Sequence, residues 1–238
     1  MRFANTVTLL LAMVALPALA TPLTPYDATY KVVRKGKTYG VATRELRQQG
    51  QQYVLTNKSD IHWLIFSDSR NEKATFTVQD GQVQAQHYEY SRKGTGSDDH
   101  YSMQFADSVV SSDGGAGVHF KGVAYDPLSY QQQLALDLAA GKKDVSFDLY
   151  QELKHKHYRF KVLGEERLST PYGEVDTIRV ERVRSPDSSR QTLFWLAPSL
   201  NYALVKLWQG KNGSEQMELV LSDFKSLPQQ AQEASLSH

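Results

Sequence analysis

The sequence has 238 residues, no cysteine, and 27 basic side chains against 26 acidic ones. This near balance argues against a protein that holds nucleic acid or an anionic membrane by bulk charge. The lack of cysteine excludes disulfides, thiolate nucleophiles and zinc sites built on sulfur.

The first twenty residues differ from the rest of the chain. Arg2 precedes an apolar run over residues 7–16, and Ala18 and Ala20 place small side chains where a cleavage site needs them. This pattern predicts a secretory signal peptide over residues 1–20, cleaved after Ala20. No cysteine follows for lipidation, and no later run approaches the length of a membrane-spanning helix. We therefore expect an exported, periplasmic protein without an integral membrane anchor.

From residue 28 onward, short runs alternate apolar and polar residues between turn signals, which is typical of strands. In the first half, strands are expected at residues 28–34, 41–48, 53–63, 73–78, 83–91, 100–105 and 109–110, and residues 118–123 lead into a helix. Asp80-Gly81 favours a type I′ turn, because both residues tolerate positive φ. The run at 53–63 keeps period two but has a polar middle, which predicts a bend or bulge near residues 57–60.

The segment YDPLSYQQQLALDLAAG at residues 125–141 predicts a helix over about 127–140. Asp126 can cap the first turn, Pro127 suits the first helical position, and Gly141 can end the helix in a left-handed conformation. One side of the helix is apolar and needs a sheet to cover it. That side comprises Leu128, Tyr130, Leu134, Ala135, Leu138 and Ala139.

The second half returns to strand patterns, at residues 145–153, 157–163, 167–170, 174–182, 192–196, 201–209 and 214–224. About a dozen sequential antiparallel strands cannot stay flat. The sequence therefore predicts an all-β, mainly antiparallel fold: a single curled sheet forming a β-roll, spiral or open barrel, plugged by one α-helix. We expect one domain over residues 21–227 and a disordered tail over 228–238.

Three stretches resemble an exported proteobacterial family of unknown function, DUF3108. They are YDPLSYQQQLALDLAAG at 125–141, LGEERLSTPYGEVDTIRVERV at 163–183 and TLFWLAPSLNYALVKLWQ at 192–209. Ala203-Leu204-Val205 replaces the Leu-Pro-Val usual in that family. The resemblance implies a periplasmic, curled antiparallel architecture similar to that of spiral-sheet envelope-integrity proteins. It implies no catalytic residue and no cofactor.

Three groups of residues could carry chemistry. His155 and His157 point to one side of a strand and could share a metal. The pair Asp60 and His62, or His100 beside residues 98–99, could orient an imidazole for base catalysis. Such arrangements are common by chance, and the sequence contains no nucleophile elbow, H-E-x-x-H motif or P-loop. We expect a solvated strand face at His155 and His157, and we assign no catalytic residue, metal site or cofactor.

Aromatic residues are the stronger candidates for a binding site. Burial in the core accounts for most aromatics in a curled sheet. An alternative is that some of them line a ligand pocket or a partner surface, because the run at 63–66 is apolar without alternation. The candidates are Trp63, Phe66, Trp195, Tyr202 and Trp208.

These observations favour a non-enzymatic periplasmic protein of cell-envelope maintenance. It would bind an envelope protein, a lipid-like ligand or a glycan in or around the concave face of its sheet. Two alternatives remain open: an envelope hydrolase that uses a His/Asp pair, and a purely structural scaffold. Histidines lying apart on exposed strands would argue against the hydrolase.

Overall fold

The computed structural model describes residues 23–63, 66–112, 115 and 117–228. The predicted signal peptide and the tail from residue 229 lie outside the described residues. Fourteen strands form one sheet. They are β1 (Tyr26–Arg34), β2 (Lys37–Gln49), β3 (Gln52–Trp63), β4 (Phe66–Gln79), β5 (Gln82–Gly94), β6 (Asp99–Ala106), β7 (Val109–Ser111), β8 (Val118–His119), β9 (Asp144–Gln151), β10 (Lys154–Thr170), β11 (Gly173–Val183), β12 (Arg190–Ala197), β13 (Ala203–Lys211) and β14 (Ser214–Ser226).

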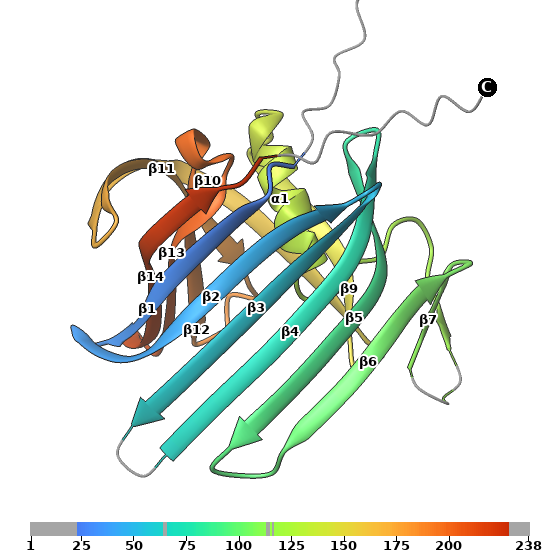
Figure 1. Cartoon of the computed structure of the whole chain (residues 1–238), viewed down its shortest axis with the longest axis horizontal. Helices are drawn as coiled ribbons and strands as arrows, with labels where there is room; N and C mark the ends of the chain where they lie inside the picture. Colours follow the sequence, from blue (N-terminus) through green and yellow to red (C-terminus); the bar gives the residue numbers. More distant parts are fainter. Residues whose placement is uncertain (1–22, 64–65, 113–114, 116, 229–238) are drawn as a thin grey trace, which may run out of the picture.

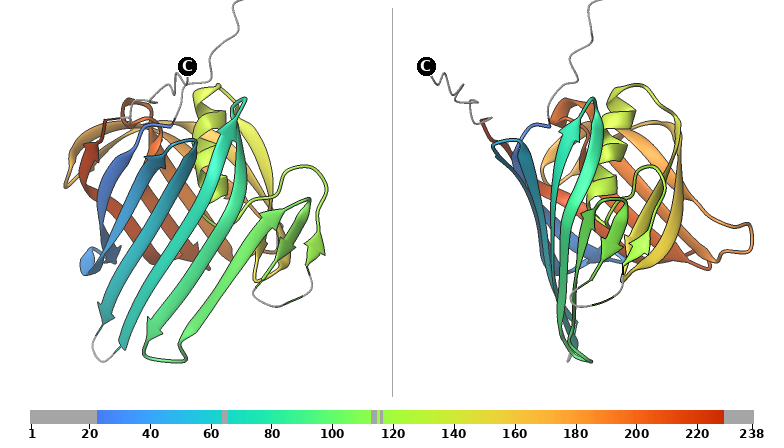
Figure 2. Two further views of the ribbon diagram at one scale, coloured as in Figure 1. Left: turned by 45° about the vertical axis from the view of Figure 1, so that its right-hand side comes forward. Right: turned by 90° about the vertical axis from the view of Figure 1, so that its right-hand side faces the viewer.

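The strand order explains the curl of the sheet. In the described residues every strand pairs with its sequence neighbours except β8 and β9, which do not pair with each other. β1 also pairs with β14 and so joins the two halves of the chain. The helix α1 (Ser129–Ala139) therefore connects β8 and β9, which are the two ends of the sheet. The sheet bends around α1, with β1–β6 on one side of the helix and β9–β14 on the other (Figures 1 and 2). The predicted curled all-β sheet is confirmed.

The two ends of the sheet approach each other without pairing in the described part of the chain. The segment after β8 joins them instead. The Phe120 ring lies 6.3 Å from that of Tyr150 on β9. Tyr125 forms a bridge with Leu149, and its backbone exchanges hydrogen bonds of 3.0 and 2.9 Å with Asp148 and Tyr150. This segment covers backbone groups of β9 that an edge strand would otherwise expose.

Several local predictions can be compared with the structure. The turn between β4 and β5 has positive φ at both Asp80 and Gly81, as predicted. The strands expected at 157–163 and 167–170 are one strand, β10, with a register shift between Val162 and Gly164. The bulge predicted near residues 57–60 is wrong. β3 pairs with β2 and β4 without a register shift, so its polar middle has another cause.

Both ends of α1 are fixed by side-chain and backbone hydrogen bonds. The Asp126 carboxylate accepts hydrogen bonds from the N–H groups of Leu128 and Ser129, at 2.7 and 2.8 Å. The regular helix begins at Ser129, two residues later than expected. At the other end Gly141 has a φ of 79°, and the amides of Gly141 and Lys142 donate to Leu138 and Asp137. This is a Schellman motif.

The helix packs inside the curl, where it contacts β4, β5 and β9. Leu134 and Leu138 are buried in the same hydrophobic cluster as side chains from both halves of the sheet. Gln133 is also buried, and its side chain accepts a hydrogen bond of 2.7 Å from the Val83 amide of β5. Within the described residues, α1 is too short and too polar to cross a membrane.

Candidate ligand-binding cavity

Three rows of side chains cross the concave face of β2–β6. Because every second residue of a strand points to the same face, the register between strands defines each row. The first, the buried row, lies nearest α1 and contains Leu46, Leu55, Ala74, Tyr88 and Met103. All of these side chains are almost completely buried.

The next two rows become progressively more polar. The middle row contains Arg44, Asn57, Glu72, Tyr90 and Tyr101. The outer row, nearer the strand tips, contains Ala42, Ser59, Arg70, Arg92 and Asp99. The concave face therefore changes from apolar beneath the helix to charged at the tips.

A cavity of about 190 Å³ lies beside the middle row. Liquid water occupies about 30 Å³ per molecule, so this space corresponds to about six waters. Its apolar wall comes mainly from β1, β13 and β14, and its polar side comes from β2–β4. The wall includes Tyr30, Val32, Ile61, Leu204, Met217 and Leu219, and the polar side includes Arg44, Asn57, Arg70 and Glu72. A second space of about 160 Å³ shares Val32, Ile61 and Met217 with it.

Arg44 is the buried charge of this cavity, with 7% of its surface exposed. Its Nε donates to Asn57 Oδ1 at 2.8 Å, and its Nη2 donates to Gln131 Oε1 at 2.5 Å. Gln131 belongs to α1 and is itself held by a hydrogen bond to the Pro127 carbonyl. The helix and β3 thus fix the orientation of the guanidinium.

Glu72 lies in the same row but interacts mainly with a tyrosine. The Tyr88 hydroxyl donates to Glu72 Oε1 at 2.6 Å. Burial raises the pKa of the Glu72 carboxyl, although Tyr88, Arg44 and Arg70 partly oppose that rise. The Glu72 carboxyl is therefore held by a hydroxyl, whereas the guanidinium of Arg44 is held by two amides.

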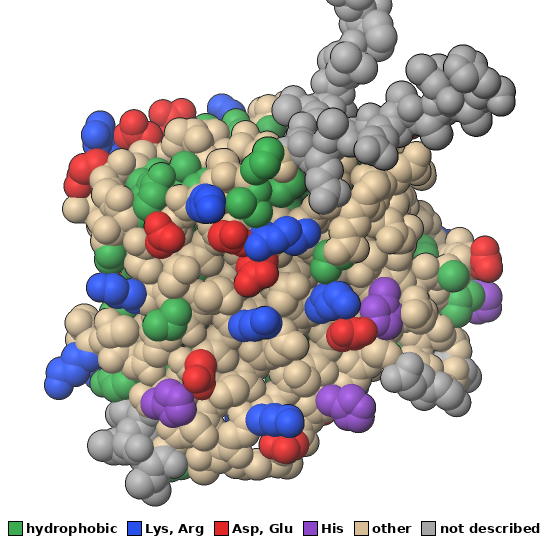
Figure 3. Space-filling view, in the orientation of Figure 1, with side chains coloured by type: hydrophobic (Ala, Val, Ile, Leu, Met, Phe, Trp, Pro, Cys, Tyr) green, Lys and Arg blue, Asp and Glu red, His purple; other side chains and the backbone are tan. Residues whose placement is uncertain are grey.

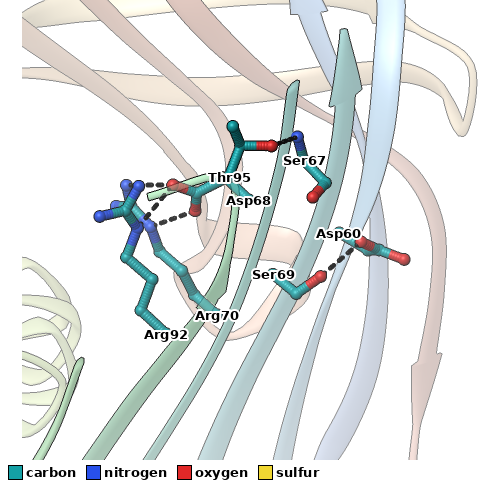
Figure 4. A network of polar contacts seen from close by, with 7 residues as sticks. All are labelled: Asp60, Ser67, Asp68, Ser69, Arg70, Arg92 and Thr95. Atoms are coloured by element: carbon teal, nitrogen blue, oxygen red, sulfur yellow. Dashed lines mark hydrogen bonds and ion pairs between the residues drawn. The ribbon is translucent and has the colours of Figure 1, made fainter. Parts of the chain in front are cut away.

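The outer row carries a second polar network (Figure 4). The Asp68 carboxylate accepts from Arg70 Nε at 2.6 Å and from Arg92 Nε at 2.8 Å. These two arginines keep the pKa of Asp68 below its usual value, although its partial burial works in the opposite direction. One carboxylate is shared between two guanidinium groups. The strand-tip side of the cavity therefore carries two guanidinium groups that share one carboxylate, with Asp99 opposite Arg92 in the same row.

A family model for proteins of unknown function, DUF3108, matches residues 25–220. The chain belongs to the DUF3108 family. A presumed lipoprotein from Parabacteroides distasonis is 13% identical in sequence, with a TM-score of 0.32, over 85% of this chain and 96% of its own. A presumed exported protein with a YmcC-like fold from Bacteroides fragilis is 13% identical, with a TM-score of 0.33 and the same coverage. No curated protein matches significantly.

Membership of DUF3108 confirms the family that the sequence resembles. A proteobacterial origin stays a prediction. The family description assigns no activity, so the function of this DUF3108 protein has to be argued from its own residues.

The predicted aromatic residues do not form one site. Trp195 is buried outside the main core: its Nε1 donates to Glu166 at 2.9 Å, and Lys206 Nζ lies 5.2 Å from its ring centroid. Phe66 is half exposed at the start of β4. The side chain of Trp63, like residues 64–65, lies outside the described residues.

The other two aromatic candidates also lie apart from the main cavity. Tyr202 is half-buried and borders a small void of about 20 Å³ that it shares with Arg44. Trp208 is half-buried, and its ring lies against Gly210, where a β-carbon would come within 2.1 Å of the ring. Binding roles for these aromatics stay predictions.

The five histidines considered for catalysis or metal binding lie on four strands. His62 is on β3, His87 on β5, His100 on β6, and His155 and His157 on β10. None of them lines the cavity. His62 and Asp60 form an exposed pair at 3.2 Å, on the opposite face of β3 from the cavity.

His155 and His157 lie on an exposed strand face, as predicted. Both bind the same carboxylate oxygen, Asp148 Oδ1, at 2.9 and 2.8 Å. Their side chains are 53% and 57% exposed. Among the described residues, no group of three or more possible ligands has the geometry to hold a metal ion.

Arg44, Glu72 and Arg70 were missed as site residues because a charged residue in a strand usually faces solvent. The sequence did contain a signal. Arg44 lies at period two between Ala42 and Leu46, and Asn57 occupies the polar middle of β3. These positions are adjacent in the register and point to the core side, so the polar middle of β3 marks the cavity.

Proposed function

We propose that this DUF3108 protein is a non-enzymatic, exported binding protein of the cell envelope that holds a lipid-like ligand on the concave face of its sheet. The observation that carries the proposal is the cavity of about 190 Å³, which the protein's own side chains leave unfilled. Apolar residues on one side and a few polar groups on the other are typical of small-molecule sites.

The opposite face of the sheet supports this choice over a partner protein. In Figure 3 acidic and basic side chains are interspersed over the middle and lower parts of the outer face, and hydrophobic side chains gather only in its upper part. Large exposed hydrophobic residues such as Val41 and Phe66 lie apart from each other in the fold. Protein interfaces usually have an apolar centre depleted of charge. A glycan is less well matched, because one wall of the cavity is apolar.

Native mass spectrometry of the protein, taken directly from the envelope of its own cells, tests the proposal. We expect a co-purifying mass on the natural protein. Leu219→Trp, which adds volume to the cavity wall, should remove it. Val41→Trp is the matched control, because Val41 is 48% exposed on the opposite face of β2. An unliganded natural protein, or a ligand that survives in Leu219→Trp, would argue against cavity binding.

The hydrolase alternative makes a different prediction. It needs an imidazole beside the bound substrate, and the histidines described above lie away from the cavity. We therefore propose that the bound molecule is released unchanged. Recovery of the ligand with the same mass after prolonged incubation with purified protein supports this, and a hydrolysed product contradicts it.

A further inference from the structure

Arg44 has hydrogen-bonding capacity that the protein does not use. A guanidinium has five N–H donors, and Asn57 and Gln131 accept from two of them. In the part of the chain that the structure describes, no carboxylate lies within 4 Å of Arg44. Both neighbours are neutral amides, which orient the group without cancelling its charge.

A buried charge without a counter-charge is costly for a folded protein. Arg44 is more than nine-tenths buried and borders the cavity. Glu72 is the carboxyl in its row, but it lies beyond ion-pair distance and is bound by Tyr88. The arrangement fits a group that awaits an anion from outside the chain.

We propose that the cavity binds a single-chain amphiphile through an anionic head group, a carboxylate or a phosphate, which pairs with Arg44. This inference rests on the proposed function and gives its ligand a chemical class. The apolar chain would lie against Val32, Met217 and Leu219, toward the second space that shares two of these residues. The planar fork of arginine suits both head groups, because each offers two oxygens to parallel N–H donors.

The outer row adds a route for the anion. Arg70 lines the cavity and shares Asp68 with Arg92 nearer the strand tips. An anionic head group entering from the tips therefore passes the guanidinium groups of Arg70 and Arg92 before it reaches Arg44. Because Asp68 and Asp99 offset these two charges, we assign the preference for an anion to Arg44.

Isothermal titration with three probes of equal chain length tests the inference: decanoate, decyl phosphate and decanol. The natural protein should bind the anionic probes at least about tenfold more tightly than decanol, since a hydrogen bond to a charged group is worth that much or more. Arg44→Gln should remove this preference while decanol binding persists. The better of the two anionic probes identifies the kind of head group.

Two variants control for folding and for general loss of charge. Arg47→Gln changes the same residue type three positions along β2, where Arg47 pairs with Asp27 on the opposite face, and it should keep the preference. Arg44→Lys keeps the charge without the fork, so it should retain part of the preference even if Arg44→Gln is unstable. Equal binding of all three probes by the natural protein, or a preference unchanged in both Arg44 variants, would overturn the inference but leave the binding function intact. Failure to bind any probe, decanol included, would overturn both.

Discussion

Asp126 is a fully buried carboxylate that holds the start of α1. One of its oxygens accepts the amides of Leu128 and Ser129, and the other is buried with no hydrogen-bond partner in the described part of the chain. Burial raises the pKa of Asp126 to about 6, although the hydrogen bonds from Ser129 and Leu128 oppose the rise. The carboxylate that accepts the amides at the start of α1 is therefore also a source of pH dependence.

The sign of that dependence follows from linkage. The folded-state pKa of Asp126 lies above the unfolded value of 3.8. The stabilisation that the protonated side chain gives the folded state is therefore complete below pH 3.8, and it is lost as the pH rises through about 6. From pH 5 to pH 8 this group should lower the free energy of unfolding by about 1 kcal/mol. Asp126→Asn keeps an oxygen acceptor for the two amides and should remove that loss.

Urea unfolding at both pH values measures this prediction. Asp107→Asn, a substitution in the exposed turn between β6 and β7, is the control and should keep the pH dependence of the natural protein. If Asp126→Asn shows the same dependence as that control, the pH sensitivity arises elsewhere.

At the scale of elements, the sequence predicted the features that depend only on residues close together in the chain. The turn at Asp80 and the helix end at Gly141 need positive φ, and the neighbouring residues alone indicate this. The cavity could not be predicted in the same way. Arg44 on β2 faces Leu204 and Leu219 across it, and these residues are far away in the sequence. Whether a polar side chain on a strand meets solvent, a partner or a cavity depends on that long-range packing.

The helix should contribute to stability mainly through one of its sides. Leu134 is 1% exposed, whereas Leu136 is half-buried. Leu134→Ala should lower the free energy of unfolding by about 2–5 kcal/mol, because it leaves a cavity between α1 and the sheet. Leu136→Ala changes the helix propensity equally and should cost clearly less. Equal losses in urea denaturation would show that α1 does not pack through the Leu134 side.

For the whole molecule, the pairing of β1 with β14 makes the folding of the two halves of the chain depend on each other. It places the first and last strands side by side in the middle of the sheet, and α1 spans the two ends. The hydrophobic cluster contains Phe76 of β4 and Phe160 of β10, which lie in different halves of the chain. Neither half can bury its inner face without the other.

We therefore expect a single cooperative unfolding transition, as the predicted single domain over residues 21–227 requires. Phe76→Leu and Phe160→Leu each remove part of a buried ring, at a cost of about 1–2 kcal/mol. Both should lower the midpoint of the same calorimetric transition, with equal calorimetric and van't Hoff enthalpies. Two independent cores would behave differently, because each substitution would then shift one of two transitions and leave the other in place.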